Sequence, residues 1–163
     1  MSNVVAWIGS ARAPIIRLTL TVLLVGGWSI AAVAQEAEEE EHQNEVALII
    51  AGTYEDEATV FTIGIEYERR FHQYLGFGGA IEYLVDGRWL FVFPVAVHPI
   101  GGLKLLAGPG FEREDGENSF IFRVGADYSF EFADRFSLTP GLDVDFIGRD
   151  GALVFGVDFG VSF

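Results

Sequence analysis

The chain has 163 residues, a length typical of a single domain. Its formal net charge of −14 excludes nucleic acid as a partner, because phosphates are bound by Lys and Arg. It contains no cysteine, which excludes disulfides, thiol chemistry and cysteine-based metal sites. Hydrophobic residues make up 50% of the chain despite this charge, so apolar and acidic residues must be sorted by position.

The first segment has the order of a secretory signal peptide. Arg12 and Arg17 precede an apolar stretch that begins at Leu18, and the small residues Ala32 and Ala34 end it. We expect residues 1–34 to be a signal peptide that is cleaved after Ala34. A retained helical anchor is the alternative, but the apolar stretch is short for the ~20 residues of a membrane span. The true start codon stays open, and the lack of a cysteine after the cleavage site excludes lipoprotein attachment.

An acidic segment follows the expected cleavage site. Residues 36–41 contain five glutamates and one alanine. Such a run repels itself, so we expect residues 35–44 to be a disordered, solvated tether. A metal-binding acidic tail is the alternative.

From residue 45 onward, apolar and polar residues alternate with a period of two, which predicts β-strands. The expected strands are 45–53, 59–70, 75–84, 89–97, 103–113, 119–132, 136–147 and 152–163. Asp86 and Gly87 signal a tight turn, and longer connections are expected at 98–102 and 114–118. Pro94, Pro109 and Pro140 lie inside strands, and each predicts a bulge or a local break because proline cannot donate to the ladder.

The last strand has one bulky apolar face and one small or polar face. The apolar face carries Leu153, Phe155, Val157, Phe159, Val161 and Phe163, and the other face carries Gly156, Asp158, Gly160 and Ser162. Eight-stranded barrels leave room inside for only a packed layer of side chains, so the glycine-rich face suits the interior. We therefore expect an all-β fold over residues 45–163: an eight-stranded antiparallel up-and-down transmembrane β-barrel. A soluble periplasmic β-barrel binding protein, with the apolar face inside, is the alternative.

Lipid leaves no partner for an unpaired backbone N–H, so a barrel in a membrane must close. With both termini on the periplasmic side, the acidic loops near Glu55, Asp86, Asp115 and Asp150 face outward. Two aromatic girdles are expected at the membrane interfaces. The outer girdle comprises Tyr54, Tyr83 and Trp89, and the inner girdle comprises Phe71, Tyr74, Phe132 and Phe163.

These features resemble the small eight-stranded outer-membrane β-barrel proteins of Gram-negative bacteria. The resemblance covers about residues 45–163 and rests on the strand number, the alternation and the final aromatic residue, with segments 67–71 and 107–113 similar to those of uncharacterised members. It implies an outer-membrane location, with lipid and lipopolysaccharide around a monomeric barrel. It also implies that the barrel-assembly machinery and periplasmic chaperones are partners during biogenesis. The implied assembly signal is Phe155, Val157, Phe159, Val161 and Phe163.

The predicted interior carries many carboxylates and few cations. Its charged residues are Glu66, Glu68, Glu82, Lys104, Glu112, Arg123, Asp127, Glu131, Asp143, Asp145 and Asp158. With a turn centred near Ala133, Arg123 and Asp143 are expected to be neighbours. Buried charges must be paired or hydrogen-bonded, which favours a salt-bridge and water network that fills a narrow lumen. A narrow cation-preferring or small-solute channel is the alternative, because carboxylate rings select cations.

Signatures of catalysis are weak. The histidines are His42, His72 and His98, and none has a serine nearby in the sequence. We expect no catalytic, cofactor-binding or metal-binding residues, and hence a structural envelope role without enzyme activity and without a cofactor. A lipid-modifying barrel enzyme is a further alternative. The short outer loops disfavour adhesion.

Overall fold

The structure, a computed structural model, describes residues 43–163. The expected signal peptide, its cleavage site at Ala32 and Ala34, and all but the last two residues of the expected tether lie outside the described residues. No helix within the described range is long and apolar enough to cross a membrane.

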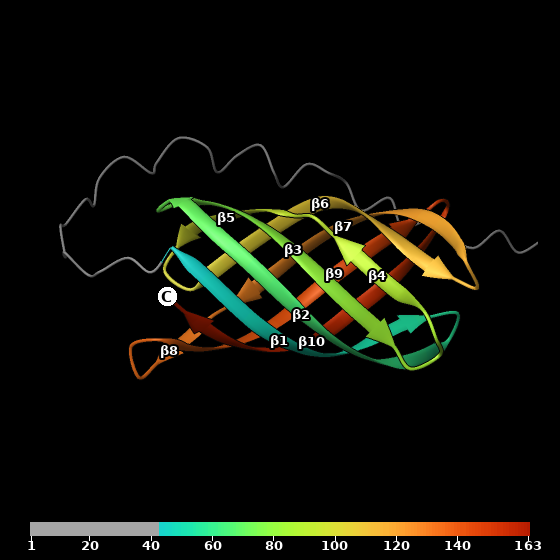
Figure 1. Ribbon diagram of the computed structural model, residues 1–163, viewed down its shortest axis with the longest axis horizontal. Coiled ribbons are helices and arrows are strands. Elements are labelled where there is room, and N and C mark those ends of the chain that lie inside the picture. The colour runs from blue at the N-terminus through green and yellow to red at the C-terminus, as the bar shows by residue number, and fades with distance from the viewer. Residues whose placement is uncertain (1–42) are drawn as a thin grey trace, which may run out of the picture. The chain divides into compact units, whose positions relative to one another are not determined.

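Ten antiparallel strands form the wall of a barrel (Figure 1). They are β1 (Asn44–Glu55), β2 (Ala58–His72), β3 (Leu75–Leu84), β4 (Trp89–Val92), β5 (Val95–Ile100), β6 (Leu103–Glu114), β7 (Glu117–Tyr128), β8 (Phe130–Phe132), β9 (Phe136–Ile147) and β10 (Asp150–Ser162). Since β5 continues the line of β4 and β8 continues that of β7, the wall has eight strand positions. The predicted eight-stranded antiparallel barrel is thus confirmed.

Pairing between β1 and β10 closes the wall. Their register runs from Glu45 opposite Ser162 to Tyr54 opposite Leu153. At the edge of this seam the backbone N–H of Asn44 donates to the carbonyl of Phe163 at 3.1 Å, and the N–H of Phe163 donates back to Asn44 at 2.8 Å. The two ends of the barrel domain therefore meet at one rim.

The break between β4 and β5 lies at Phe93 and Pro94. Val92 pairs with Gly110 before the break and Val95 pairs with Ala107 after it, so the register does not shift. Phe93 therefore faces Pro109, and its N–H donates to the Pro109 carbonyl at 2.9 Å. The return bond is absent because proline has no N–H. Two prolines thus interrupt one ladder at the same height.

A second break, between β7 and β8, lies beside the third proline. Asp127 pairs with Gly141 and Phe130 pairs with Leu138, which places Pro140 opposite Tyr128 in an unshifted register. The predicted local break is confirmed for Pro94, whereas β6 and β9 run unbroken through Pro109 and Pro140 and the interruption lies in the neighbouring strand. None of the three prolines shifts the register.

Two predicted connections are wrong because the strands run further than expected. His98 belongs to β5, and only Gly101 and Gly102 form the turn into β6. A register shift between Val97 and Ile100 accommodates the proline between them. The loop expected at 114–118 is a two-residue turn in which Asp115 and Gly116 have φ of 49° and 90°. Such left-handed pairs match the twist of a hairpin.

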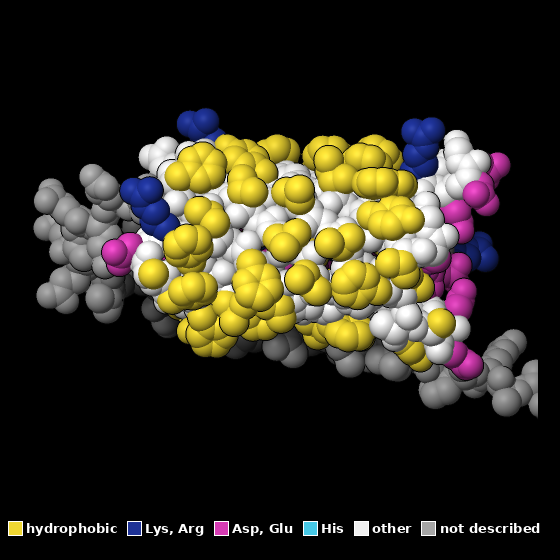
Figure 2. Space-filling view, turned by 60° about the horizontal axis from the view of Figure 1, so that its bottom comes forward, with side chains coloured by type: hydrophobic (Ala, Val, Ile, Leu, Met, Phe, Trp, Pro, Cys, Tyr) yellow, Lys and Arg dark blue, Asp and Glu magenta, His cyan; other side chains and the backbone are white. Residues whose placement is uncertain are grey.

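The large apolar residues point away from the barrel axis, as the sequence predicts. Ile65 in the middle of β2 is 59% exposed and Leu142 on β9 is 53% exposed. Figure 2 shows apolar side chains spread over the wall, with acidic side chains gathered at the end of the barrel opposite the rim where Asn44 and Phe163 meet. This orientation contradicts the alternative of a soluble barrel with an apolar interior. An exterior of this kind is stable against hydrocarbon.

Candidate functional site in the barrel lumen

The lumen contains charged clusters arranged along the barrel axis. We call the rim where Asn44 and Phe163 meet the termini end, and the other rim the far end. The turn residues at the far end are those between β1 and β2, β3 and β4, β6 and β7, and β9 and β10. Each cluster depends on a residue that reaches from one strand or turn to strands elsewhere in the wall.

Arg123 on β7 holds the central cluster. Its Nε and Nη2 each donate to a different carboxylate oxygen of Asp145 on β9, both at 2.7 Å. The same guanidinium also binds the carboxylate of Glu82 on β3, with Nη2 3.0 Å from Oε2. Asp145 is fully buried and Glu82 is 1% exposed, so both charges depend on this arginine for compensation.

The expected pairing of Arg123 with Asp143 is wrong by two residues. The β8–β9 turn is centred on Asp134, since Phe132 pairs with Phe136, and this register places Arg123 opposite Asp145. Moving the centre of a hairpin by one residue moves each partner by two. The side chain of Asp143 instead lies over Gly125, where an added Cβ would overlap it.

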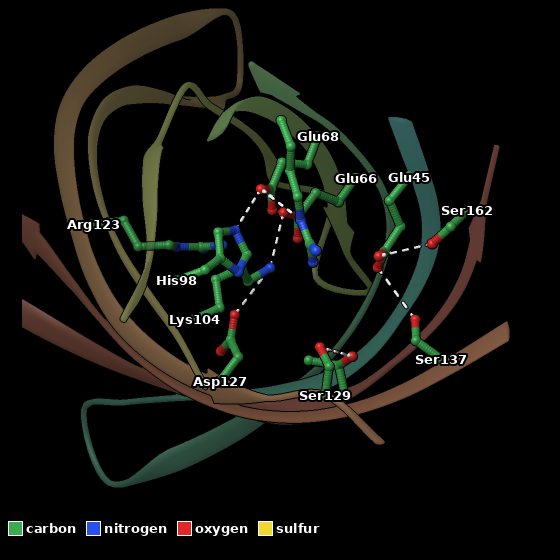
Figure 3. Close-up of polar contacts among 12 residues, drawn as sticks. Glu45, Glu66, Glu68, His98, Lys104, Arg123, Asp127, Ser129, Ser137 and Ser162 are labelled. Atoms are coloured by element: carbon green, nitrogen blue, oxygen red, sulfur yellow. Dashed lines mark hydrogen bonds and ion pairs between the residues drawn. The ribbon is translucent and has the colours of Figure 1, made fainter. Parts of the chain in front are cut away.

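Lys104 on β6 forms the next cluster toward the termini end. Its Nζ lies 3.1 Å from Glu66 Oε1 on β2 and 3.1 Å from Asp127 Oδ2 on β7. Figure 3 shows the ammonium between these two carboxylates, which reach it from different parts of the wall. The lysine is thus satisfied by two acids although it is buried.

Glu68 and His98 form a third contact beside it (Figure 3). His98 Nε2 lies 2.7 Å from Glu68 Oε1, which joins β2 to β5 across the intervening β3. Gly76 on β3 leaves room for this crossing, since a Cβ there would lie 2.9 Å from Glu68 Cδ. This pair was not predicted, because His98 was expected in a turn.

Arg88 closes the far end. Its Nη1 donates to Glu55 Oε2 at 2.7 Å and to Glu112 Oε2 at 3.0 Å, while its Nε donates to Asp86 Oδ2 at 2.9 Å. Burial alone would lower the pKa of Arg88, but hydrogen bonds to Asp86 and Glu55 and the charge of Glu112 outweigh it and raise the pKa. Sequence reasoning missed Arg88, although its position directly after the Asp86–Gly87 turn is visible in the chain.

Below Arg88 the lumen is filled by hydrocarbon. Leu84, Leu90, Val92, Ile121 and Val154 point inward and belong to one buried cluster, which we call the apolar plug. Leu84 and Ile121 have no exposed surface. The plug was not predicted. Its residues are apolar at inward positions, where the alternation of the strands predicts small or polar side chains. The plug lies beside the Arg123 cluster, since Leu90 pairs with Glu82, whereas the Lys104 and His98 contacts lie nearer the termini end.

A small cavity remains near the middle of the lumen. Its volume is about 30 Å³, and Asp143 and Asp158 are among its lining residues. A water needs roughly 10–15 Å³ measured in this way, so the cavity has room for about two waters. Within the described residues, Asp143 Oδ1 is buried and has no hydrogen-bond partner.

The other predicted interior residues are placed as follows. Glu131 is exposed on β8, near the tip of the β8–β9 hairpin, and takes no part in the lumen. The remaining ten are buried or half-buried and lie at inward positions: Glu66, Glu68, Glu82, Lys104, Glu112, Arg123, Asp127, Asp143, Asp145 and Asp158. Glu112 belongs with Arg88 rather than with the central clusters.

The predicted girdle residues lie at the two ends of the wall. At the far end the rings of Tyr83 and Trp89 are 4.9 Å apart, and Tyr54 lies at the end of β1. At the termini end Phe132 stacks on Phe136 at 6.0 Å, and the remaining members, Phe71, Tyr74 and Phe163, are exposed. In the terminal strand Phe155, Phe159, Val161 and Phe163 are exposed and Val157 is half-buried.

Neither described histidine contacts a serine hydroxyl among the hydrogen bonds of residues 43–163. His98 binds Glu68, and His72 Nδ1 accepts a bond from the N–H of Tyr74 at 3.2 Å. In the same range, no three His, Asp or Glu side chains are grouped so that they could hold a metal ion.

No protein-family model matches the chain, and no curated protein matches it. Solved structures do. The N-terminal β-barrel domain of Pseudomonas aeruginosa OprF is 17% identical with a TM-score of 0.57, and the match covers 74% of this chain and 98% of that one. Neisserial surface protein A is 15% identical with a TM-score of 0.55, covering 74% and 96%. A de novo designed transmembrane β-barrel is 12% identical with a TM-score of 0.53, covering 72% and 95%.

The closed wall, the apolar exterior and these likenesses define the class. The chain has the fold of the small eight-stranded outer-membrane β-barrels. At these identities the likeness concerns the fold, and the fold does not select an activity.

Proposed function

We propose that the protein is a monomeric integral protein of the Gram-negative outer membrane with a structural role in the envelope, without catalysis and without ion conduction. The termini end faces the periplasm and the far end faces outward. Membrane lipid and lipopolysaccharide surround the wall, and the barrel-assembly machinery and periplasmic chaperones act on the chain before it folds.

The observation that carries this proposal is the closure of the lumen. The cavity lined by Asp143 and Asp158 measures about 30 Å³, which is room for about two waters and less than a hydrated ion needs. The plug residues Leu84, Leu90 and Ile121 and the buried ion pairs of Arg123 occupy the lumen beside this cavity. Passage would require an ion to lose its hydration shell and to displace these packed side chains, which costs several kcal/mol.

The exterior supports the location. Large apolar side chains cover the wall between Trp89 at the far end and Phe132 at the termini end, which is the arrangement that outer-membrane barrels present to lipid. The ladder between β1 and β10 pairs the backbone along the seam, and the bonds between Asn44 and Phe163 extend it to the rim, as a hydrocarbon environment demands.

Membrane fractionation tests the location. The protein should sediment with the outer membrane, and unheated samples should migrate differently from boiled samples in SDS, because a closed barrel resists the detergent. A mature chain that stays monomeric in water without detergent would overturn the proposal.

Planar bilayer recording tests the closure. We expect no steady conductance from purified, folded protein at neutral pH, with a porin of known conductance as the positive control. Steady cation-selective steps would instead support the second candidate, a narrow cation channel.

The second candidate has one observation in its favour. Within the described residues, Asp143 Oδ1 is buried without a hydrogen-bond partner beside the cavity, and an unpaired carboxylate there would attract cations. If the lumen conducts, Asp143→Asn should lower the cation current while leaving the Arg123 cluster intact. Asp145→Asn should lower the current as well, but it also removes a partner of Arg123.

Altered lipid A or phospholipid in cells that overproduce the protein would contradict the absence of catalysis.

A further inference from the structure

Two of the three carboxylates around Arg88 come from opposite parts of the wall. Glu55 ends β1 and Glu112 lies near the end of β6, and the strand order β1-β2-β3-β4-β6 puts them on opposite sides of the far rim. One nitrogen, Nη1 of Arg88, lies 2.7 Å from the first carboxylate and 3.0 Å from the second. A single side chain therefore spans the mouth.

Asp86 fixes the arginine in this position. The backbone N–H of Arg88 donates to Asp86 Oδ1 at 3.2 Å and its Nε donates to Asp86 Oδ2 at 2.9 Å. Both residues belong to the short β3–β4 turn, so the guanidinium is oriented by its own turn before it reaches across. Its side chain is only 11% exposed, although it lies on a loop at the rim. A planar guanidinium with several donors suits this task, whereas an ammonium acts as a point charge.

We propose that Arg88, Asp86, Glu55 and Glu112 form a latch that closes the far mouth of the lumen. Behind this latch the lumen is open to water at the termini end alone. The apolar plug and the latch seal the far half, and the other half is a vestibule that water enters only from the termini end. The proposal rests on the function proposed above, since it assigns the closure of the lumen to a specific contact.

Burial along the lumen supports this asymmetry. In the far half, Thr62 on β2 and Leu84 on β3 are opposite each other and neither has exposed surface. At the termini end, the inward residues Glu45 and Ser162 are half-buried. Glu45 bonds Ser162 at 3.3 Å and Ser137 at 3.2 Å, and these contacts line the wall without crossing the mouth (Figure 3).

Loss of Arg88 should open the far mouth because the remaining groups repel one another. Glu55, Asp86 and Glu112 would be left near one point with no cation among them, and like charges at such distances disfavour each other. The strand ends that carry Glu55 and Glu112 would then move apart and admit water to the top of the plug.

The chain contains no cysteine, so single cysteines report access cleanly. We would place Thr62→Cys below the latch and, in a separate chain, Ser162→Cys at the termini end. Each is folded into lipid nanodiscs, which leave both ends open to water. The probe is a methanethiosulfonate that carries a trimethylammonium group, and the rate of modification is followed by mass.

The expected result is fast labelling of Ser162→Cys and slow labelling of Thr62→Cys while Arg88 is present. Adding Arg88→Gln should speed labelling at position 62 by about tenfold or more, since loss of one charge-assisted contact shifts an opening equilibrium by roughly that factor. Labelling at position 162 should not change. The matched control is Arg149→Gln, which removes the same charge from an exposed turn residue at the same end.

A further variant separates opening from misfolding. Adding Glu55→Gln and Glu112→Gln to Arg88→Gln removes the repulsion, so labelling at position 62 should slow again, and heat-modifiable mobility verifies that every variant is folded. Equal labelling with and without Arg88, or an equal effect of Arg149→Gln, would overturn the latch alone. Labelling of Thr62→Cys as fast as Ser162→Cys in the presence of Arg88 would instead overturn the closed lumen.

Discussion

Arg123 and Asp145 face each other across β7 and β9, and both carboxylate oxygens of Asp145 accept a hydrogen bond from the guanidinium at 2.7 Å. The carboxylate has no exposed surface, so the arginine is its compensation. This geometry makes the pair a determinant of barrel stability.

Removing the arginine should therefore be costly. We expect Arg123→Met to lower the free energy of unfolding by about 3–5 kcal/mol, because Glu82 and Asp145 stay buried without a partner. Urea unfolding in lipid vesicles, followed by gel mobility, measures it. Adding Glu82→Gln and Asp145→Asn should recover most of the loss, and an unchanged midpoint for Arg123→Met alone would contradict this account.

The wall beside Pro94 should leave no room for a larger residue in place of Gly108 on the neighbouring strand β6. A Cβ at Gly108 would lie 2.5 Å from Pro94 Cα and overlap the carbonyl of Phe93, and backbone cannot move aside cheaply. We expect Gly108→Ala to cost about 1–3 kcal/mol or to prevent assembly. Gly79→Ala is the control, because its nearest neighbour is a Phe93 ring atom at 3.8 Å. Equal unfolding midpoints for the two variants would show that the wall relaxes at the break.

The lipid-facing surface should reject charge according to depth. Ile65 lies in the middle of β2 and Phe71 lies near its termini end, and both are exposed. We expect Ile65→Arg to cost about 2–4 kcal/mol and Phe71→Arg about 0–1 kcal/mol in a bilayer. Reversible unfolding from vesicles measures both, and a similar cost at the two positions would argue against a membrane-spanning orientation.

The final aromatic residue should matter for assembly more than for stability. Phe163 is exposed at the seam, and its backbone bonds to Asn44 do not depend on the ring. We expect Phe163→Ala to reduce the amount of protein in the outer membrane of cells, whereas purified protein refolds into vesicles as well as the unsubstituted chain does. A parallel loss of refolding would assign the ring a packing role instead.

The latch should withstand alkaline pH. The pKa of Arg88 is raised, so the stability from its charge is fully present below the ordinary pKa of arginine and is lost only as pH rises through the still higher folded value. We expect labelling at Thr62→Cys, corrected for thiol ionisation, to be as slow at pH ~10 as at pH ~7. In Arg88→Lys it should rise toward the lysine pKa of about 10.4. A rise with Arg88 intact would mean that other groups hold the mouth.

Much of the wall follows from alternation alone. The predicted ranges of β3 and β9 coincide with the observed strands. A period of two over ten or more residues determines which side chains point inward and which point outward. The prolines were also informative, since a missing N–H must interrupt a ladder wherever the strand lies. Glycines on the inner face indicated which side is crowded.

The lumen was less predictable, because its contacts depend on register and on side-chain reach. A one-residue difference in the centre of the β8–β9 turn exchanged Asp145 for Asp143 as the partner of Arg123. His98 and Glu68 are joined across a strand that neither occupies, which no local pattern reports. Arg88 belongs to a turn, and patterning of strands says nothing about where a turn residue reaches.

The bonds between Asn44 and Phe163 have a consequence for engineering. Because these two residues are already adjacent, a short linker could join them, and the polypeptide could be reopened at Asp115 and Gly116 to give a circular permutant. Such a rearranged chain would keep every pair of neighbouring strands, but β10 would no longer be at the C-terminus of the polypeptide. The permutant would therefore distinguish two requirements. One is the strand pairing that the folded barrel needs, and the other is the order of strands that export and membrane insertion need.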